Sequence, residues 1–343
     1  MIKPSVIYYR PENWKHCKSE KLNLIHVPIT GENPILRSGR LAGDGVGEVV
    51  SEFNSNLLIK KFNEYKPDFF FYWALYGSFT PSLCAKLKKI SPKTVFIFGQ
   101  GNQVLHRGLV DEWMLGYRDF CDVVLTNTYE HSRHALLIKY GAKKTGVLYD
   151  GFDPAMFDHP LENPKFDCFF GGGCSMNREK TIQRFPNTKI RYDFLKAVSS
   201  KYKLHIKGGN WITPIDKTFE NPLVTISNGV TGRDYVKAMQ TGKIILNVYH
   251  FDFDRYYTKR TVYAMASGRI YLTRYIPHID DVLKFEEDLV WFRTFDEGIN
   301  LIDYYLKNDE VRESVAAKIR ANAYQKQSWE ARLREFEAIV EKL

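Results

Sequence analysis

The chain has 343 residues, of which 44% are hydrophobic and 15% aromatic, and it carries a net charge of +9. This apolar content excludes a disordered chain, and the length favours two domains over one. No run of roughly eighteen uncharged apolar residues predicts a membrane span, and Met1–Arg10 lacks the apolar stretch of a signal peptide. We therefore expect a soluble, cytoplasmic protein. The positive charge suits an anionic partner, either nucleic acid or an anionic membrane surface.

The cysteines favour neither a zinc site nor a disulfide framework. The five of them form no Cys-x-x-Cys pair, and they lie in apolar segments at positions 17, 84, 121, 168 and 174. We expect reduced thiols, and we predict no metal site.

Strands and helices alternate along the first half of the sequence. β-branched and aromatic runs predict strands, and apolar residues at helical spacing predict helices. A glycine-rich loop at Gly39–Gly47 precedes the first helix, and Gly141 ends the last one. The expected strands are 5–9, 22–27, 68–73, 94–98 and 122–126, and the expected helices are 48–65, 81–90, 111–118 and 130–140. This βαβ series predicts a parallel sheet covered on both faces.

A second series of the same kind follows a proline-punctuated linker at Asp158–Pro164. Its expected strands are 166–170, 203–207, 224–226, 243–248, 269–273 and 288–292, and its expected helices are 191–200, 232–241, 259–266, 295–306 and 310–327. A charged amphipathic helix is expected over 329–343. Two doubly wound domains bind ligands at the carboxyl ends of their strands, so we expect the two sheets to face one cleft.

The segment Lys165–Arg178 runs from an apolar strand into three glycines, at 171 to 173, and then Ser175. Glycines let backbone N–H groups approach an anion closely, and a following helix N-terminus adds partial positive charge. The pattern predicts a phosphate-binding loop. A tight turn with no ligand is the alternative for the glycines taken alone.

Several motifs between roughly residues 120 and 340 carry a resemblance to a known family. They are Gly146–Phe157, Phe170–Gly173, Ile206–Trp211, Gly242–Asn247, Arg260–Gly268 and Trp329–Arg332. In these motifs and their order the chain resembles GT-B glycosyltransferases, and specifically the spore-maturation-type, CgeB-like family. It is more distantly similar to the DNA β-glucosyltransferase of T-even phages in the Gly-Gly loop, the downstream arginine and the Arg-x-x-x-x-Met-Ala-Ser segment.

The resemblance implies an α/β protein with the GT-B fold, built from two Rossmann-like domains. Residues 1–155 are then the acceptor-binding domain, 156–325 the domain that binds a nucleotide-sugar, and 326–343 a C-terminal helix that crosses back to the first domain. It implies an enzyme that moves a sugar from a nucleotide-sugar, a UDP-sugar in the first instance, to an acceptor hydroxyl. No further cofactor is expected.

Glycines and arginines are the expected donor contacts, because the leaving nucleoside diphosphate gains negative charge. A second arginine is expected beside Arg260, and Arg191 is slightly favoured over Arg178 for its register with the following strand. Tyr263 stands where the family commonly has a carboxylate that binds ribose, so nucleotide identity stays open. The implied donor-binding residues are Gly172, Gly173, Ser175, Arg178, Arg191, Gly208, Gly209, Val230, Tyr257, Arg260 and Tyr263.

The sequence supplies no clear catalytic base. The segment after the strand 94–98 reads Phe-Gly-Gln-Gly-Asn, without a carboxylate. Gln100 and Asn102 can orient a hydroxyl but cannot take its proton. The catalytic candidates are Asp44, Gln100, His106 and Asp111. A retaining mechanism needs no enzyme base, so the stereochemical outcome stays open.

Two competing motif interpretations are set aside. Asp252-Phe253-Asp254 resembles an Asp-x-Asp metal motif, but a hard cation needs several converging oxygen ligands. The glycine run is not Gly-x-Gly-x-x-Gly, and no acidic residue follows the next strand, which disfavours a dinucleotide-dependent dehydrogenase.

Three hypotheses remain for the acceptor. The first is a hydroxymethylated pyrimidine in double-stranded phage DNA, held as a flipped nucleotide. The second is a cell-surface, spore or other glycan, made by an enzyme that touches an anionic membrane peripherally. The third is a catalytically inactive module that binds a sugar-nucleotide or nucleic acid. The acceptor-binding candidates are Arg37, Arg40, Trp73, Tyr76 and Asn102, with Gln100 and His106 beside them.

Overall fold

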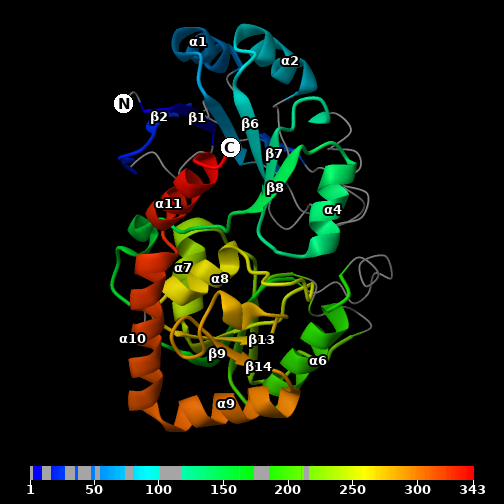
Figure 1. The fold of residues 1–343 in the computed structure, drawn as a ribbon. Coiled ribbons are helices and arrows are strands. Elements are labelled where there is room, and N and C mark those ends of the chain that lie inside the picture. Colours follow the sequence, from blue (N-terminus) through cyan, green and yellow to red (C-terminus); the bar gives the residue numbers. More distant parts are fainter. Residues whose placement is uncertain are drawn as a thin grey trace. The chain divides into compact units, whose positions relative to one another are not determined.

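The computed structural model describes most of the chain and divides it into two compact units (Figure 1). Unit 1 comprises residues 1–149 and 329–343, and unit 2 comprises residues 150–328. The described residues are 3–9, 17–27, 35–37, 48–50, 55–73, 80–100, 117–161, 163–173, 185–209, 211 and 216–343. Across these residues, no helix combines the length and apolar character that a membrane crossing requires.

Unit 1 is built on a six-stranded sheet in the order β2-β1-β5-β6-β7-β8, with every neighbouring pair parallel. Its strands are β1 (Ser5–Tyr9), β2 (Asn23–His26), β5 (Phe69–Trp73), β6 (Val95–Gln100), β7 (Val123–Thr126) and β8 (Lys144–Val147). A separate antiparallel pair joins β3 (Ile35–Arg37) to β4 (Glu48–Val50).

Both faces of this sheet are buried, which explains its continuous apolar strands. Phe70 and Phe96 face a core shared with the helices α1 (Ser55–Tyr65), α2 (Pro81–Ile90) and α4 (His131–Lys139). Phe71 and Ile97, one residue later on the same strands, face a core completed by α11 (Trp329–Val340). Successive side chains of a strand point to opposite faces, so a strand covered on both sides must be apolar throughout. The last helix of the chain therefore belongs to unit 1.

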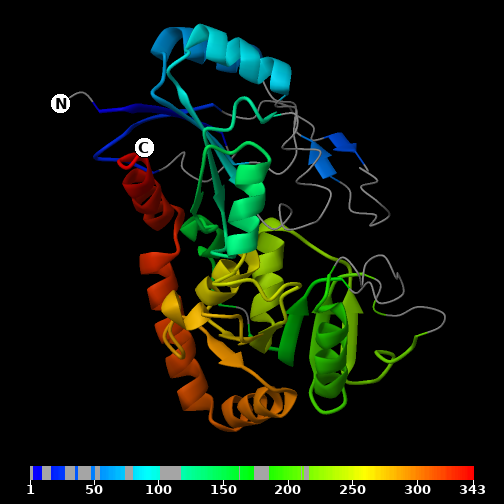
Figure 2. The same ribbon diagram turned by 45° about the vertical axis from the view of Figure 1, so that its right-hand side comes forward.

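Unit 2 has a second parallel sheet, in the order β11-β10-β9-β12-β13-β14. Its strands are β9 (Phe166–Gly171), β10 (Leu204–Lys207), β11 (Val224–Ser227), β12 (Gly242–Asn247), β13 (Ile270–Arg274) and β14 (Val290–Phe292). Its helices are α6 (Thr188–Ser199), α7 (Gly232–Gln240), α8 (Lys259–Ala266), α9 (Phe295–Lys307) and α10 (Asp309–Lys326). Figure 2 shows helices on both sides of these strands. The strand order is doubly wound and reverses between β9 and β12.

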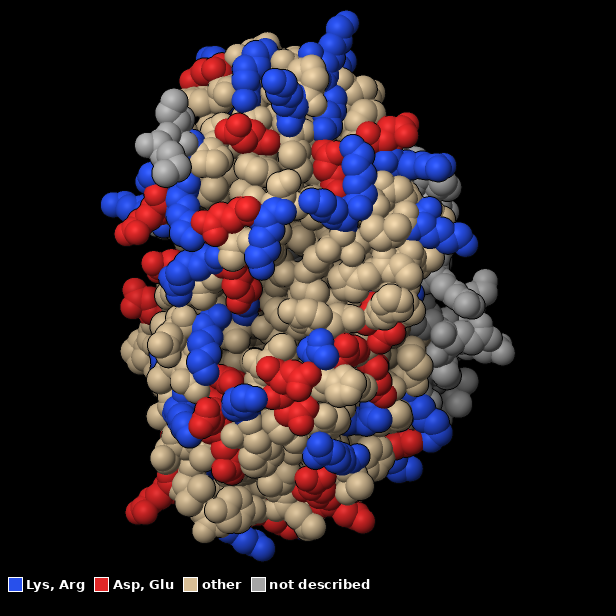
Figure 3. Space-filling model, viewed as in Figure 1, with Lys and Arg blue, Asp and Glu red and all other residues tan. Residues whose placement is uncertain are grey.

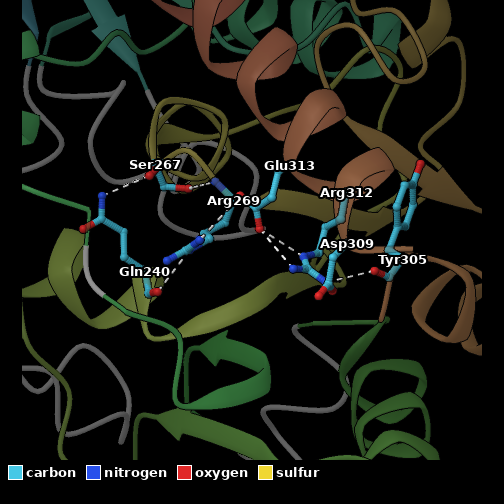
Figure 4. Close-up of polar contacts among 7 residues, drawn as sticks. All are labelled: Gln240, Ser267, Arg269, Tyr305, Asp309, Arg312 and Glu313. Carbon is cyan, nitrogen blue, oxygen red and sulfur yellow. Dashed lines mark hydrogen bonds and ion pairs between the residues drawn. The ribbon is translucent and has the colours of Figure 1, made fainter. Parts of the chain in front are cut away.

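A polar network built on the buried Arg269 and Arg312 joins helices and strands at the amino edge of the unit 2 sheet (Figure 4). Arg269, which precedes β13, donates through Nε to the Gln240 carbonyl at 3.2 Å, and its Nη1 lies 3.9 Å from Glu313. Arg312 donates to Glu313 at 3.1 Å and to the Tyr305 carbonyl at 3.1 Å. These bonds fix α10 against the strand it covers.

Most predicted elements are confirmed, and one prediction is wrong at its start. The predicted helix 48–65 begins with the strand β4, and the helix α1 starts at Ser55. Val49 and Val50 are β-branched and pair with β3, which outweighs their helical spacing. The glycine-rich loop 39–47 lies outside the described residues, as does most of the predicted helix 111–118.

Candidate functional site

The candidate site lies at the carboxyl edge of the unit 2 sheet, where the strand order reverses. β9 ends at Gly171 and its neighbour β12 ends at Asn247. Beyond β9, the Gly172 amide donates to the Lys207 carbonyl at 2.9 Å, and the indole of Trp211 donates to the Gly172 carbonyl at 2.7 Å. Open α/β sheets bind ligands at such a reversal, because the loops on its two sides diverge there.

Two glycines allow the backbone to pack closely at this edge. A Cβ on Gly208 would lie 2.2 Å from the Gly172 carbonyl oxygen, and one on Gly171 would lie 2.3 Å from the Tyr235 hydroxyl. The contact at Gly208 is with backbone, so that position requires glycine, whereas a Cβ on Gly171 would require the Tyr235 side chain to move. The predicted glycine loop is therefore a close-packed backbone surface. Its role in binding an anion stays a prediction.

Arg260 extends over this surface from the first turn of α8. Its Nη1 donates to Asn247 Oδ1 at 3.4 Å, and the same atom is 3.5 Å from where a Cβ of Gly172 would stand. The side chain is half-buried. The guanidinium group is thus placed beside the ends of β9 and β12, and its role in donor binding stays a prediction.

The N-terminus of α8 points to the same edge and adds partial positive charge. Thr258 precedes the helix, and its amide donates to Thr261 Oγ1 at 3.3 Å as part of a capping box. A helix N-terminus carries roughly half an elementary positive charge and favours anions nearby.

Arg191, in the first turn of α6, is buried and bonded to the loop that follows β12. It is 3% exposed, and its Nε and Nη2 donate to the Val248 carbonyl at 2.9 and 2.6 Å. Its Nη1 lies 3.0 Å from His250 Nε2, and its guanidinium carbon is 5.5 Å from the Phe170 ring centre. These bonds hold the loop after β12. Arg178, its rival for the second donor contact, lies outside the described residues.

The two arginines act on the same two tyrosines, the half-buried Tyr235 and the buried Tyr256. Burial raises the pKa of Tyr235, and the charges of Arg260 and then Arg191 oppose that rise. Burial also raises the pKa of Tyr256. The charge of Arg260 lowers this pKa, the charge of Asp150 raises it, and the charge of Arg191 lowers it. Both arginines lie near the carboxyl edge of the sheet, Arg260 half-buried beside Gly172 and Arg191 buried against the loop after β12. Such an arrangement is chemically suited to a phosphate or diphosphate.

Tyr257 and Tyr263 are packed inside unit 2. Tyr257 is 2% exposed, and its hydroxyl donates to the side chain of Gln327 at 3.1 Å. Gln327 directly follows α10, so this bond links Tyr257 to the end of that helix. Tyr263 donates to the Met156 sulfur at 3.2 Å, and the Lys259 ammonium lies 5.1 Å from its ring centre. A direct role of either tyrosine in donor binding stays a prediction.

The remaining donor candidates lie at the ends of β10 and β11. Gly208 and Gly209 follow β10, and a Cβ on Gly209 would meet no atom within 4 Å. Val230 is half-buried between β11 and α7. Gly173 is described just after Gly172, whereas Ser175 lies outside the described residues.

Asp252 and Asp254 each contact a neighbouring basic side chain. Arg274 contacts Asp252 at 2.7 Å, and Asn187 donates to the same oxygen at 2.7 Å. Asp254 lies 2.9 Å from His278 Nδ1. The described residues contain no group of three or more histidine, cysteine or carboxylate side chains that could hold a metal ion.

The described unit 1 candidates lie at strand ends. Trp73 and Gln100 end the neighbouring strands β5 and β6, so both belong to the carboxyl edge of their sheet, and Arg37 ends β3. The other unit 1 candidates lie outside the described residues: Arg40, Asp44, Tyr76, Asn102, His106 and Asp111.

Two residues of the site were not singled out from the sequence. Asn247 is the polar end of an apolar strand, a signal that was present in the motif Gly242–Asn247. Tyr235 lies on α7, and no local pattern indicates that it reaches Gly171.

Solved structures similar to this chain include an α-glucosyltransferase and a protein in complex with UDP and glucose. An α-glucosyltransferase in complex with UDP-glucose and DNA containing an abasic site is similar at a TM-score of 0.61 and 10% identity, covering 98% of this chain and 99% of that chain. The Anabaena protein HepE, in complex with UDP and glucose, is similar at 0.56 and 13% identity, covering 94% and 87%. The chain has the GT-B fold.

The second half of the chain also matches a protein family in sequence. Residues 190–338 match a family described as glycosyl transferase-like, and this span contains Arg191, Asn247 and Arg260. A mutant of S. aureus TarM, in complex with fondaparinux, α-GlcNAc-glycerol and UDP, is similar at a TM-score of 0.52 and 14% identity, covering 84% of this chain and 59% of that chain. No curated protein sequence matches the chain.

Proposed function

We propose that this protein is a glycosyltransferase that takes a hexose or pentose from a nucleotide-sugar, a UDP-sugar in the first instance, bound at the carboxyl edge of unit 2. The observation that carries the proposal is the position of Arg260 over Gly172 and Asn247, at the reversal of the strand order. The glycosyl transferase-like match over 190–338 supports it.

The chemistry follows from the charge that develops during transfer. As the bond between the anomeric carbon and the diphosphate oxygen breaks, the leaving nucleoside diphosphate gains negative charge. Arg260 and the N-terminus of α8 stabilise that charge more in the transition state than in the ground state, which lowers the barrier. The glycine backbone beside them lets the diphosphate approach without a side chain in its way.

The acceptor that we favour is a hydroxymethylated pyrimidine in DNA. The similarity to the DNA-bound α-glucosyltransferase and the net charge of +9 support this choice. A glycan acceptor is the second candidate, supported by the similarity to TarM in complex with a glycan ligand. Asp44, Gln100, His106 and Asp111 stay candidates for the groups that orient or deprotonate the acceptor hydroxyl.

The proposal is tested by offering a panel of UDP- and GDP-sugars together with duplex DNA containing hydroxymethylpyrimidines. Mass spectrometry of the digested nucleosides detects sugar transfer, and a thermal-shift screen of the same panel identifies the donor. A glycan acceptor panel is run in parallel. If no donor binds and none is hydrolysed, the glycosyltransferase proposal fails.

Arg260→Ala is expected to lower donor affinity or turnover at least tenfold, because it removes a charge-assisted contact worth about 2 kcal/mol. Arg260→Lys keeps the charge but loses the fork geometry, so it is expected to retain part of the activity. Lys318→Ala, which removes an exposed cation of α10, is the matched control and is expected to behave like the parent protein. Full activity in Arg260→Ala would contradict the assignment.

A further inference from the structure

The positive charge of unit 1 is concentrated in one segment. Residues 55–100 carry seven lysines and two carboxylates, Glu64 and Asp68, so this segment alone has a surplus of five positive charges against +9 for the whole chain. The described lysines lie on α1, on α2 and in the turns that follow them. Figure 3 shows Lys and Arg side chains gathered over these helices, at the top of the view.

Helical geometry directs part of this charge outward. On α1, Leu58 and Phe62 are fully buried in the core, and Lys60 lies between them, about 200° around the helix from Leu58. On α2, Leu83 and Leu87 are buried, whereas Lys86 and Lys89 are exposed. The two helices pack beside each other over the same face of the sheet. Their outward sides therefore form one continuous surface.

Some of the seven lysines already have partners within unit 1. Lys61 pairs with Glu64 at 3.2 Å, Lys88 pairs with Asp122 at 2.7 Å, and Lys66 donates to the Ile90 carbonyl at 2.9 Å. The other four are exposed and form no ion pair with any carboxylate in the described part of the chain. We name them the outer lysines: Lys60, Lys86, Lys89 and Lys93.

We propose that the outer lysines form a binding surface for the phosphate backbone of a nucleic acid. Lysine is a flexible point charge that neutralises phosphates without reading base sequence, so a set of four predicts binding that is strong at low salt and independent of sequence. This surface belongs to unit 1, whereas the proposed donor site belongs to unit 2, and it carries none of the acceptor candidates.

The chemistry of the surface favours nucleic acid over a lipid bilayer. A membrane-binding helix places large apolar side chains beside its cations, so that they insert between lipid headgroups. On the described residues of α1 and α2, the one large hydrophobic side chain that is exposed is Tyr65, at 38%, and the Lys61 ammonium lies 4.9 Å from its ring centre. Little apolar area is therefore available for insertion.

The length of α1 and α2 is compatible with one DNA duplex that reaches both the outer lysines and the carboxyl edge of the unit 1 sheet. α1 and α2 link parallel strands, so each runs from the carboxyl edge of the unit 1 sheet to its amino edge. Their ten or eleven residues span about 16 Å, the length of about five base pairs. This step rests on the proposed function: a duplex whose modified base lies at the carboxyl edge can place its flanking phosphates on the outer lysines.

The test compares two variants with the same change of charge. In the first, the four outer lysines are replaced by glutamine (Lys60→Gln, Lys86→Gln, Lys89→Gln and Lys93→Gln). In the control, four exposed lysines of unit 2 are replaced in the same way (Lys217→Gln, Lys237→Gln, Lys284→Gln and Lys318→Gln). Glutamine keeps the helix propensity, so both variants are expected to fold, which circular dichroism checks.

Binding is measured by fluorescence anisotropy with an unmodified duplex of about 20 base pairs, between about 50 and 200 mM salt. The outer-lysine variant is expected to bind at least tenfold more weakly, and its salt slope is expected to fall by about 0.9 for each phosphate that it no longer neutralises. The control variant is expected to bind like the parent protein. UDP-sugar binding, measured separately by thermal shift, is expected to be unchanged in both.

Each outcome decides the inference independently of the proposed function. Unchanged DNA affinity and salt slope in the outer-lysine variant would overturn it, as would a parent protein that binds phosphatidylserine vesicles and no duplex. If the outer lysines are needed for binding but no sugar reaches DNA, the surface stands and the proposed acceptor falls. If sugar does reach DNA, shortening the duplex to fewer than about five flanking base pairs is expected to raise the KM of the parent protein for DNA. The same shortening is expected to leave the KM of the outer-lysine variant unchanged.

Discussion

At the scale of single residues, the candidate site depends on contacts that leave no space for an added atom. The Gly172 carbonyl lies where the Cβ of any larger residue at position 208 would stand. The same carbonyl accepts the indole N–H of Trp211, so it cannot move away without breaking that bond. The loops after β9 and β10 are thereby locked together at the place where Arg260 extends over them.

Gly208→Ala is therefore expected to destabilise unit 2 by about 2 kcal/mol, because a Cβ would displace backbone rather than a flexible side chain. It is also expected to weaken donor binding, since the displaced carbonyl belongs to Gly172. Denaturant unfolding and donor titration measure the two effects. Gly229→Ala is the control, because a Cβ there would meet no atom within 4 Å and the residue has no positive φ. A Gly208→Ala variant as stable as this control would disprove the close contact.

A second prediction at this scale concerns metal removal. Asp252 and Asp254 already accept contacts from Arg274 and His278, so their oxygens are engaged by protein groups. Arg260 can supply the positive charge that a divalent cation supplies elsewhere. We expect sugar transfer to continue at an unchanged rate after dialysis against EDTA. Loss of activity that Mg²⁺ or Mn²⁺ restores would show a metal requirement.

At the scale of elements, a single carboxylate joins the ends of several unit 1 strands. Asp122 precedes β7 and accepts hydrogen bonds from Lys88, Lys143 and the Phe96 amide at 2.7, 2.7 and 2.8 Å. Burial alone raises the pKa of Asp122. The hydrogen bonds from the two lysines and the amide outweigh burial, so the pKa is held below its usual value of 3.8.

Asp122→Asn is expected to lower the stability of unit 1 by about 2 kcal/mol at pH 7, because it weakens charge-assisted hydrogen bonds. A carboxyl with a depressed folded-state pKa contributes its full stability above its unfolded pKa and loses it as the pH falls through the folded pKa. The difference between parent and variant should thus begin to shrink as the pH falls below 3.8 and should vanish once the pH is below the depressed folded-state pKa. Denaturant titrations at pH 7 and pH 3 measure it. Asp119→Asn, at an exposed carboxylate, is the control, and a difference independent of pH would contradict this account.

The sequence predicted the elements better where both faces of a strand are buried. Continuous apolar runs marked β5, β9 and β12 to within about one residue, because a strand covered on both sides must be apolar throughout. β8 was not predicted, because Lys144–Val147 is an edge strand with exposed and half-buried side chains. Its lysine, threonine and glycine form no apolar run.

The candidate site was predictable in part for a related reason. Arg260 was indicated by its motif, and the glycines by the strand before them. The contact of Arg260 with Asn247, and that of Tyr235 with Gly171, depend on the order of strands in the sheet and on how α7 packs against it. Local periodicity carries no information on that order, so these partners required the folded structure.

At the scale of the whole molecule, the final helix supplies part of the core of the first unit. Phe336 on α11 is fully buried, and its ring centre lies 4.6 Å from that of Phe71 on β5. Trp329, Leu333 and Val340 line the same core. Unit 2 is thus inserted between the main part of unit 1 and its last fifteen residues.

Phe336→Ala is expected to destabilise unit 1 by about 4 kcal/mol, the usual cost of removing a buried aromatic ring. Hydrogen exchange resolves the two units, so amides of β1 and β5 should exchange faster while those of β9 and β12 keep their rates. Arg334→Ala, at an exposed position of the same helix, is the control. If the strands of unit 2 became less protected instead, α11 would have been assigned to the wrong unit.

The place of α11 also sets the sequence of events during synthesis. A nascent chain emerges from the ribosome with its N-terminus first, and domains generally fold as they appear. All residues of unit 2 have emerged once Ser328 has emerged. At that point the sheet of unit 1 lacks α11, so one of its apolar faces is uncovered. We therefore expect unit 1, although translated first, to complete its fold after unit 2, because the helix that covers its second apolar face is translated after unit 2.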